Sequence, residues 1–439
     1  MSRSSNGRRS RVAALGVATL VLAACASSSP SASQGPLASG QIGGALTIWT
    51  AWGGGELAAF QKVLEPFKAT TGIDVSLTTV RDIAQLAINV EAGTKLPDIA
   101  SPPTADKRED WAKDGVMKAL EDFIDIDAYT SATYPALVTC PEATCVDIGI
   151  VDGKHYQLYV KTQVKGLQWY NAKVFTDEPP TTYDEMLAIT PPSGASLFCM
   201  GLESGSDSGW PASDMVGNII MRQSGAQVFT DWYQGKHKWN SPEIKAAYEL
   251  FGQMADKAYG GTNTALSTAF QRGHKPLFSD PPGCLFYEQA TFVTAFFLED
   301  YPDLKAVDDY NFFVDPGIDP ANDGNVMGFA DSFVMYNDTP QARAFMNFMT
   351  TKEAQEIFVG AGGTLAARAD VTNFPDPVFQ TAADVAANAK NLLPTPGDQM
   401  PSDMKKAYWK SLLDFVNDQS KLDSLLTHLD EVQAASYPQ

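Results

Sequence analysis

The chain has 439 residues, with 52 acidic against 32 basic side chains and a formal net charge of −20. This excess of negative charge excludes nucleic acid and anionic lipid headgroups as partners of its surface, and it suits a neutral or cationic ligand. A chain of this length can form two domains with sizeable cores.

The first 24 residues have the pattern of a secretory signal peptide. Four arginines and no acid precede an apolar run at 12–24, which ends in small residues. This run is shorter than the roughly 20 residues that a membrane-spanning helix needs. The sequence Leu22-Ala23-Ala24-Cys25 is similar to the bacterial lipobox, whose cysteine is diacylated and becomes the first residue. An ordinary signal peptide with a chance cysteine is the alternative.

The segment after Cys25 has the composition of a flexible tether. Residues 27–40 are rich in Ser, Pro, Gly and Ala and cannot form a packed core, so we assign 25–44 to a lipidated cysteine and its linker. Without the signal peptide the chain keeps 28 basic and 52 acidic residues, a net charge of −24. We expect acyl chains such as palmitate on Cys25 to hold the protein at the extracytoplasmic face of the cell membrane without a spanning segment.

The body of the protein opens with a βαβ pattern. The sequence predicts a strand at 45–50, a Gly-rich loop, and a helix with apolar positions from 57 to 67, which Pro66 should kink or shorten and for which Gly72 is a plausible C-cap. Further strands are predicted at 73–77 and 97–100, which indicates an α/β domain with a mostly parallel sheet. Later in the chain we expect a strand at 166–171 and helices near 184–187, 242–258, 340–359 and 403–417.

If Cys25 is lipidated, four cysteines remain in an exported body, as expected of disulfides. They are Cys140, Cys145, Cys199 and Cys284, which allow three pairings. We favour a small loop closed by Cys140 and Cys145 and a bridge between Cys199 and Cys284, with the other pairings open. A zinc site is the less favoured alternative because the spacing of the first pair suits the metal poorly.

The sequence carries no motif of a known catalytic or cofactor site. P-loop, HExxH and GxSxG patterns are absent, and the four histidines are widely spread. Asp319 to Gly324 resembles a calcium loop but lacks an oxygen ligand at the third position and has Ala330 where a bidentate glutamate is needed, so a turn is favoured. We therefore expect no catalytic residue, no metal and no cofactor. Paired carboxylates suited to glycoside hydrolysis keep a secreted glycosidase or lyase as an alternative.

Several aromatic residues stand beside polar or Gly-rich segments. A sugar offers apolar faces and a rim of hydroxyls, so its site needs rings for stacking and polar side chains for hydrogen bonds. Trp52 follows the first strand, where open α/β sheets bind ligands. Trp210 lies among hydroxyls and carboxylates, Tyr287-Glu288 follow a Pro-Pro-Gly-Cys turn, and Trp409 begins a helical stretch. Packing in a core is the alternative for each ring taken alone.

Ordered motifs from about residue 41 to 430 resemble a known family. Leu46–Trp49, Phe67–Val75 and Leu96–Ile99 resemble the opening of maltose-type periplasmic binding proteins. The middle is more similar to the α-glucoside-binding lipoproteins of ABC importers, in the stretches 165–171, 199–205, 209–214, 281–284, 399–401 and 408–410. The resemblance also implies that Cys199 and Cys284 are suited to pair.

The resemblance implies a type II, maltose-binding-like fold of two α/β lobes with a hinge and a central ligand cleft. We expect the first lobe at 41–162 plus 327–370 and the second at 163–326 plus 371–439. In such proteins the closed form, with an α-glucoside or another oligosaccharide in the cleft, is presented to ABC permease subunits. We expect a monomer that is not an enzyme. A binding lipoprotein for a peptide, a polyamine or a metal is the remaining alternative.

The resemblance also implies a set of ligand-binding residues. Asp98 comes from the Pro-Asp-Ile stretch, although the aromatic residue that maltose-type proteins carry just after it is missing. Trp409 matches the ring that lies under the sugar in the maltose type. The full predicted set is Trp52, Glu56, Asp98, Lys161, Thr162, Glu203, Trp210, Asp214, Tyr287, Glu288, Asp331 and Trp409.

Overall fold

A mixed sheet of seven strands organises one part of the molecule. The computed structural model describes residues 41–80, 84–101, 107–139, 148–192, 194–362 and 364–437. The strand order is β12-β6-β11-β3-β1-β2, and β13 pairs with β11. These strands are β1 (Ala45–Thr50), β2 (Asp74–Thr79), β3 (Ile99–Ser101), β6 (Leu158–Val164), β11 (Asn325–Met335), β12 (Leu365–Ala366) and β13 (Asn391–Leu393).

The expectation of a mostly parallel sheet is correct for its first three strands and for the pair of β11 with β13, but not for the rest of the sheet. β1 is parallel to β2 and β3, whereas β11 runs antiparallel to β3 and β6, and β12 runs antiparallel to β6. The sequence pattern of the opening βαβ units does not reveal these later strands because they come from segments far along the chain, beginning at Leu158, Asn325 and Leu365.

A second sheet of four strands has the order β10-β7-β9-β8. Its strands are β7 (Leu167–Asn171), β8 (Ser196–Cys199), β9 (Cys284–Gln289) and β10 (Tyr310–Val314), and a separate two-stranded ribbon joins β4 (Ile150–Val151) to β5 (Lys154–His155). Within the four-stranded sheet only β8 and β9 are parallel. The protein thus has two α/β lobes, each built on its own sheet, as expected.

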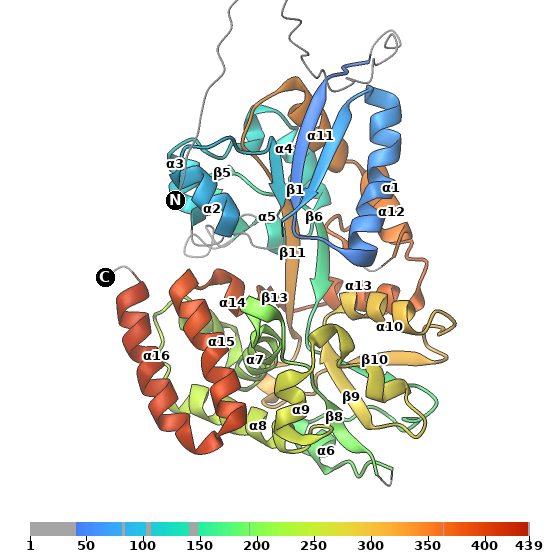
Figure 1. Ribbon diagram of the computed structural model, residues 1–439, viewed down its shortest axis with the longest axis vertical. Coiled ribbons are helices and arrows are strands. Elements are labelled where there is room, and N and C mark those ends of the chain that lie inside the picture. The colour runs from blue at the N-terminus through green and yellow to red at the C-terminus, as the bar shows by residue number, and fades with distance from the viewer. Residues whose placement is uncertain are drawn as a thin grey trace, which may run out of the picture. The chain divides into compact units, whose positions relative to one another are not determined.

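The chain passes from one sheet to the other within two residues. β6 ends at Val164 and β7 begins at Leu167, so Lys165 and Gly166 form the whole connection. Gly166 has φ of 68°, and a β-carbon there would lie 2.7 Å from the amide nitrogen of Asn218, so glycine is required. β11 pairs with β6, and Figure 1 shows these two strands side by side as they leave the upper part of the view.

Helices cover both sheets. The helices of the first 190 residues are α1 (Gly54–Thr71), α2 (Ala84–Glu91), α3 (Arg108–Lys113), α4 (Ile126–Ala132), α5 (Pro135–Val138) and α6 (Tyr183–Ala188). They are followed by α7 (Trp210–Tyr233), α8 (Pro242–Asp256), α9 (Gly261–Ser267), α10 (Thr294–Asp300), α11 (Pro340–Met349), α12 (Lys352–Gly360), α13 (Pro377–Ala387), α14 (Pro396–Gln399), α15 (Ser402–Asn417) and α16 (Leu422–Ser436). No helix in the described ranges is long and apolar enough to cross a membrane.

The predicted helices are found, with two differences. Pro66 does not shorten α1, which continues to Thr71 and ends where Gly72 adopts a left-handed conformation with φ of 68°. The segment predicted as one helix over 340–359 is two, because the Thr351 hydroxyl accepts a hydrogen bond from the Ala354 amide and starts α12 anew. The long helix α7 was not predicted, since apolar residues occur all round it.

Two of the hydrophobic cores have clear sequence origins. Phe60, Val63, Leu64 and Phe67 recur at helical spacing along α1 and face β1, α11 and α12. The core of the second lobe is formed mainly by α7, α8, α15 and α16. Each lobe therefore has its own hydrophobic core.

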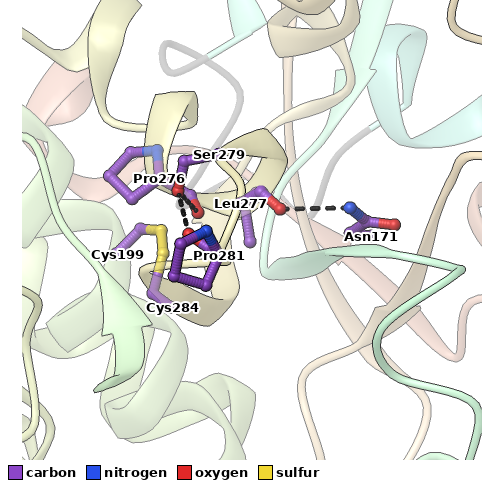
Figure 2. The surroundings of a disulfide bond; sticks show 7 residues. All are labelled: Asn171, Cys199, Pro276, Leu277, Ser279, Pro281 and Cys284. Atoms are coloured by element: carbon purple, nitrogen blue, oxygen red, sulfur yellow. Dashed lines mark hydrogen bonds between the residues drawn. A yellow bond between two sulfur atoms is a disulfide. The ribbon is translucent and has the colours of Figure 1, made fainter. Parts of the chain in front are cut away.

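The predicted bridge between Cys199 and Cys284 is confirmed. It joins neighbouring strands β8 and β9, with the two α-carbons 5.5 Å apart (Figure 2). The Pro-Pro-Gly turn before Cys284 is fastened beside it, since the Ser279 hydroxyl donates to the carbonyls of Pro276 and Pro281. Cys25, Cys140 and Cys145 lie outside the described residues, as do the signal peptide and residues 25–40 of the predicted tether.

Candidate binding site

Four of the predicted residues meet around one buried ammonium group. The Lys161 side chain on β6 is only 1% exposed, and its Nζ lies 2.5 Å from Glu56 Oε1 and 2.7 Å from Asp331 Oδ2. The Trp52 ring lies 5.0 Å from the same ammonium, and its indole N–H donates to Asp331 Oδ2. Burial opposes the charge of Lys161, but the carboxylates of Asp331 and Glu56 outweigh it and raise its pKa.

The Trp52 ring belongs to the core of the first lobe. It is 4% exposed and makes edge contacts with Phe60, Phe333 and Phe358. A sugar would have to displace this packing before it stacked on the ring. The structure therefore favours Trp52 as a support for Asp331 and Lys161, and leaves Glu56, with 28% of its side chain exposed, as the most accessible member of the group.

A small recess that is open to solvent, called the pocket below, lies where the chain enters the second lobe. Its walls come from the β6–β7 connection, the first turn of α7 and the end of β9. The lining residues are Lys165, Gly166, Pro211, Asp214, Glu288, Gln289 and Ala290. Two of them, Asp214 and Glu288, belong to the predicted set.

Lys165 joins this pocket to a group of aromatic rings. Its Nζ lies 2.6 Å from Asp214 Oδ2, 5.3 Å from the centre of the Trp210 ring and 4.8 Å from that of Phe329. Trp210 is partly exposed and makes an edge contact with Phe270. An ammonium between two ring faces is a favourable arrangement. Burial raises the pKa of Asp214 to about 6, although Lys165 opposes the shift.

A chain of buried polar groups continues from Glu288 into the lobe. The Gln168 amide donates to Glu288 Oε2 at 3.3 Å and to Asp315 Oδ1 at 2.7 Å. Asn218 donates to the other Asp315 oxygen and accepts from the Arg222 Nε. Burial raises the pKa of Glu288 well above its ordinary value, and the charges of Asp315 and Asp214 raise it further.

Two predicted residues of the first lobe serve the backbone. Asp98 Oδ2 accepts from both the amide and the hydroxyl of Thr47 at 2.8 Å, three residues before the end of β1. The Thr162 hydroxyl donates to the Phe329 carbonyl and is buried between β6 and β11. Neither side chain is brought to the pocket, because the hydrogen bonds that hold it fasten neighbouring strands.

Three predicted residues of the second lobe lie around α7 rather than on the pocket wall. Glu203 accepts from the Gly205 amide at 2.7 Å, and the fully buried Tyr287 hydroxyl donates to the Phe270 carbonyl at 2.5 Å. Trp409 on α15 is 9% exposed, and its indole N–H donates to the Ser213 hydroxyl.

Trp409 also supports the first turn of α7. A β-carbon at Gly209, where φ is 101°, would lie 2.5 Å from the Trp409 carbonyl. Trp409 thus fixes both ends of the segment that carries Trp210 and holds the pocket wall in place.

Sequence reasoning did not single out Lys165, Gln289, Phe270 or Phe329. Lys165 begins the stretch 165–171 that resembles the family, and its spacing of four residues from Lys161 along an extended segment predicts that both side chains point to the same side. Phe329 lies two residues before Asp331, and of this stretch only Asp331 was predicted to bind ligand. Within the described ranges, no cluster of three or more metal-ligating side chains is found.

The sequence matches the family described as bacterial extracellular solute-binding protein over residues 62–426. It is 27% identical over 420 residues to the osmoprotective compounds-binding protein GgtB of Synechocystis, covering 92% of this chain and 95% of that protein. It is 30% identical over 402 residues to the alpha-glucosides-binding periplasmic protein AglE of Rhizobium meliloti, covering 87% and 85%.

The same architecture recurs in solved structures. The bacterial solute receptor AcbH superposes with a TM-score of 0.76 at 16% identity, covering 90% of this chain and all of that one. The GacH receptor of Streptomyces glaucescens has a TM-score of 0.67 at 15% identity, with 91% of this chain and 100% of that chain covered. At such identities these likenesses establish the fold.

Proposed function

The chain belongs to the bacterial extracellular solute-binding proteins, and from this membership we propose that it is a lipid-anchored receptor that captures an α-glucoside for an ABC importer. Its family places it outside the cytoplasm as the sugar-binding component of such an importer. The specific sugar, the anchor and the identity of the contacting residues are the proposed parts.

The pocket beside Trp210 is the observation that carries the proposal. A partly exposed indole lies next to a wall on which Asp214 Oδ1, Glu288 Oε1 and Gln289 Oε1 have no hydrogen-bond partner. A pyranose can place an apolar face on the ring, with its hydroxyls toward the polar residues that line the pocket. The ligand in this proposal enters between the lobes, with Glu56 reaching it from the first lobe.

The lobes are proposed to be residues 41–162 plus 327–370 and residues 163–326 plus 371–439. The β6–β7 connection and β11 then form the hinge that they share. Contacts with both lobes would favour the closed form, which the permease subunits recognise. Trp52, Asp98, Thr162, Glu203, Tyr287 and Trp409 are proposed to support the site, and Glu56, Lys161, Trp210, Asp214, Glu288 and Asp331 to line it.

An α-glucoside is favoured by the relative named for alpha-glucosides, which is 30% identical to this chain. A second candidate ligand is a small osmoprotective compound, because the relative named for such compounds matches 92% of the chain. A thermal-shift screen with maltose, isomaltose, trehalose, sucrose, maltodextrins and glycine betaine separates the two. A ligand at 100 times its dissociation constant adds about 2.7 kcal/mol of stability.

The proposed receptor binds its ligand without turnover. A nitrophenyl α-glucoside incubated with the purified protein should release no nitrophenol, whereas sustained release would favour the alternative of a glycosidase. We further propose that Cys25 carries the acyl chains and that the mature protein is a monomer. Replacement by Cys25→Ser should release the protein from the membrane, and continued anchoring would reject the lipid assignment.

A further inference from the structure

The charged groups buried around the pocket do not balance if all are ionised. In the described part of the chain, three acids gather there, Asp214, Glu288 and Asp315, and two cations accompany them, Lys165 and Arg222. All five side chains are at least nine-tenths buried. Because an uncompensated buried charge costs several kcal/mol, either a proton or a cationic ligand must complete the set.

The two cations are committed to the other acids. Lys165 lies 2.6 Å from Asp214. Burial raises the pKa of Asp315, the charge of Arg222 opposes this shift, and the Arg222 Nε donates to Asn218, which also bonds Asp315. Glu288 receives only the longer hydrogen bond from Gln168, at 3.3 Å. The third, uncompensated acid is therefore Glu288.

The pocket itself disfavours a cationic ligand. Lys165 forms part of its wall, so a second ammonium entering it would meet a like charge in a partly desolvated space. The oxygens without partners, on Asp214, Glu288 and Gln289, all accept hydrogen bonds. A neutral ligand with several hydroxyls satisfies these oxygens without adding charge.

We propose that Glu288 keeps a proton at neutral pH, shared with Asp315, and that the pocket consequently selects a neutral, hydroxyl-bearing end of the ligand over a cationic one. The ligand half of this inference rests on the proposed function. In this proposal one oxygen of Glu288 donates its proton to Asp315, and the other oxygen stays an acceptor.

The surroundings of Glu288 support this proton. Burial, Asp315 and Asp214 raise the pKa of Glu288, and Arg222 alone among the named groups lowers it. Tyr183 faces the same acids from α6, and burial and their charges raise its pKa well above its ordinary value, so it stays neutral. Lys165 compensates Asp214 rather than Glu288.

The proton can be tested without any ligand by comparing urea unfolding of the wild type, Glu288→Gln and Asp214→Asn. Because the pKa of Glu288 is raised in the folded protein, its protonation stabilises the fold fully below the unfolded value of 4.5. This stabilisation is lost progressively as the pH rises. As the pH rises above 4.5, the unfolding constant of the wild type should therefore rise relative to that of Glu288→Gln, by up to about tenfold per pH unit, until Glu288 ionises in the folded protein.

Near pH 7.5 the variant Glu288→Gln should be more stable than the wild type. The matched change Asp214→Asn should instead lower the stability at this pH, because it removes a carboxylate that is paired with Lys165. Its urea midpoint should fall below that of the wild type. If both amide variants were destabilised by the same shift at every pH, Glu288 would be ionised and the proposal overturned.

The ligand half is tested by calorimetry with maltose and isomaltose as neutral probes and spermidine as the cationic probe. The Gln side chain in Glu288→Gln is a neutral analogue of protonated Glu288. This variant should therefore bind the neutral sugar at least about tenfold more tightly than Glu288→Ala does. Spermidine binding that both variants weaken equally would overturn the inference. If no sugar binds the wild type, the proposed function fails, while the unfolding comparison still decides the proton.

Discussion

Lys161 Nζ and Asp331 Oδ2 lie 2.7 Å apart on paired strands of the first lobe, and Glu56 reaches the same ammonium from the start of α1. One buried cation thus fastens β6, β11 and the start of α1. The two strands of the proposed hinge, β6 and β11, are thus linked to Glu56, the most exposed residue of this group.

We predict that Lys161→Met destabilises the protein by about 3–5 kcal/mol, because two carboxylates lose the cation that compensates them. Urea denaturation measures this change. Lys113→Met is the matched control, since Lys113 pairs with Glu109 at a surface where both side chains are half exposed. Such exposed pairs contribute little to stability. Equal effects of the two substitutions would contradict the assigned role of Lys161.

Trp409→Ala should cost about 3–5 kcal/mol of stability, as expected for a large ring removed from a core. The ring is 9% exposed and its indole bonds Ser213. Differential scanning calorimetry should show a lower Tm before any sugar is added. A Tm equal to that of the wild type, with sugar binding abolished, would instead make Trp409 a direct ligand contact.

The double variant Cys199→Ala/Cys284→Ala should lose about 2–5 kcal/mol, as for removal of a native disulfide. The bridge closes a segment of 85 residues between strands β8 and β9. A peptide map without reductant should recover the two cysteines in one linked pair. Alkylation of both thiols in the untreated protein would show that the bridge does not form.

His274 should make stability depend on pH in acid. It is fully buried against Phe297, and burial lowers its pKa to about 4, with Asp300 opposing the shift and Lys275 adding to it. A depressed folded-state pKa gives stability that is complete above the unfolded value of 6.5 and is lost toward about pH 4.

The variant His274→Gln should flatten this pH dependence of the urea midpoint. His428→Gln is the control, because the His428 side chain is 64% exposed and should leave the wild-type curve unchanged. Parallel curves for the wild type and His274→Gln would show that another group titrates.

The sequence was informative where local patterns and the architecture agree. The helix that contains Phe60 and Phe67 and the strand Ala45–Thr50 are both predicted by the spacing of apolar residues within the segment itself. The pairing of Cys199 with Cys284 followed from the cysteine count together with the family resemblance.

The remainder depended on long-range packing. Trp52 follows a strand and lies in a Gly-rich loop, as a ligand-binding ring should, yet Phe333 and Phe358 enclose it from segments nearly 300 residues away. Tyr287 and Glu288 are neighbours on β9, so their side chains point to opposite faces and only Glu288 reaches the pocket. The sequence does not predict a role for Lys165, because that role depends on its ion pair with Asp214 and its contact with the Phe329 ring. Both partners are distant in sequence, and no local pattern connects them to Lys165.

Calorimetric titration of the wild type and Trp210→Ala with maltose, isomaltose, trehalose and sucrose tests the central claim most directly. We predict that at least one of these sugars binds the wild type at a single site and that Trp210→Ala weakens it about tenfold, at an unchanged Tm, because stacking on the ring is lost. Absence of binding by all the sugars, or equal affinity of the two proteins, would contradict a sugar site beside Trp210.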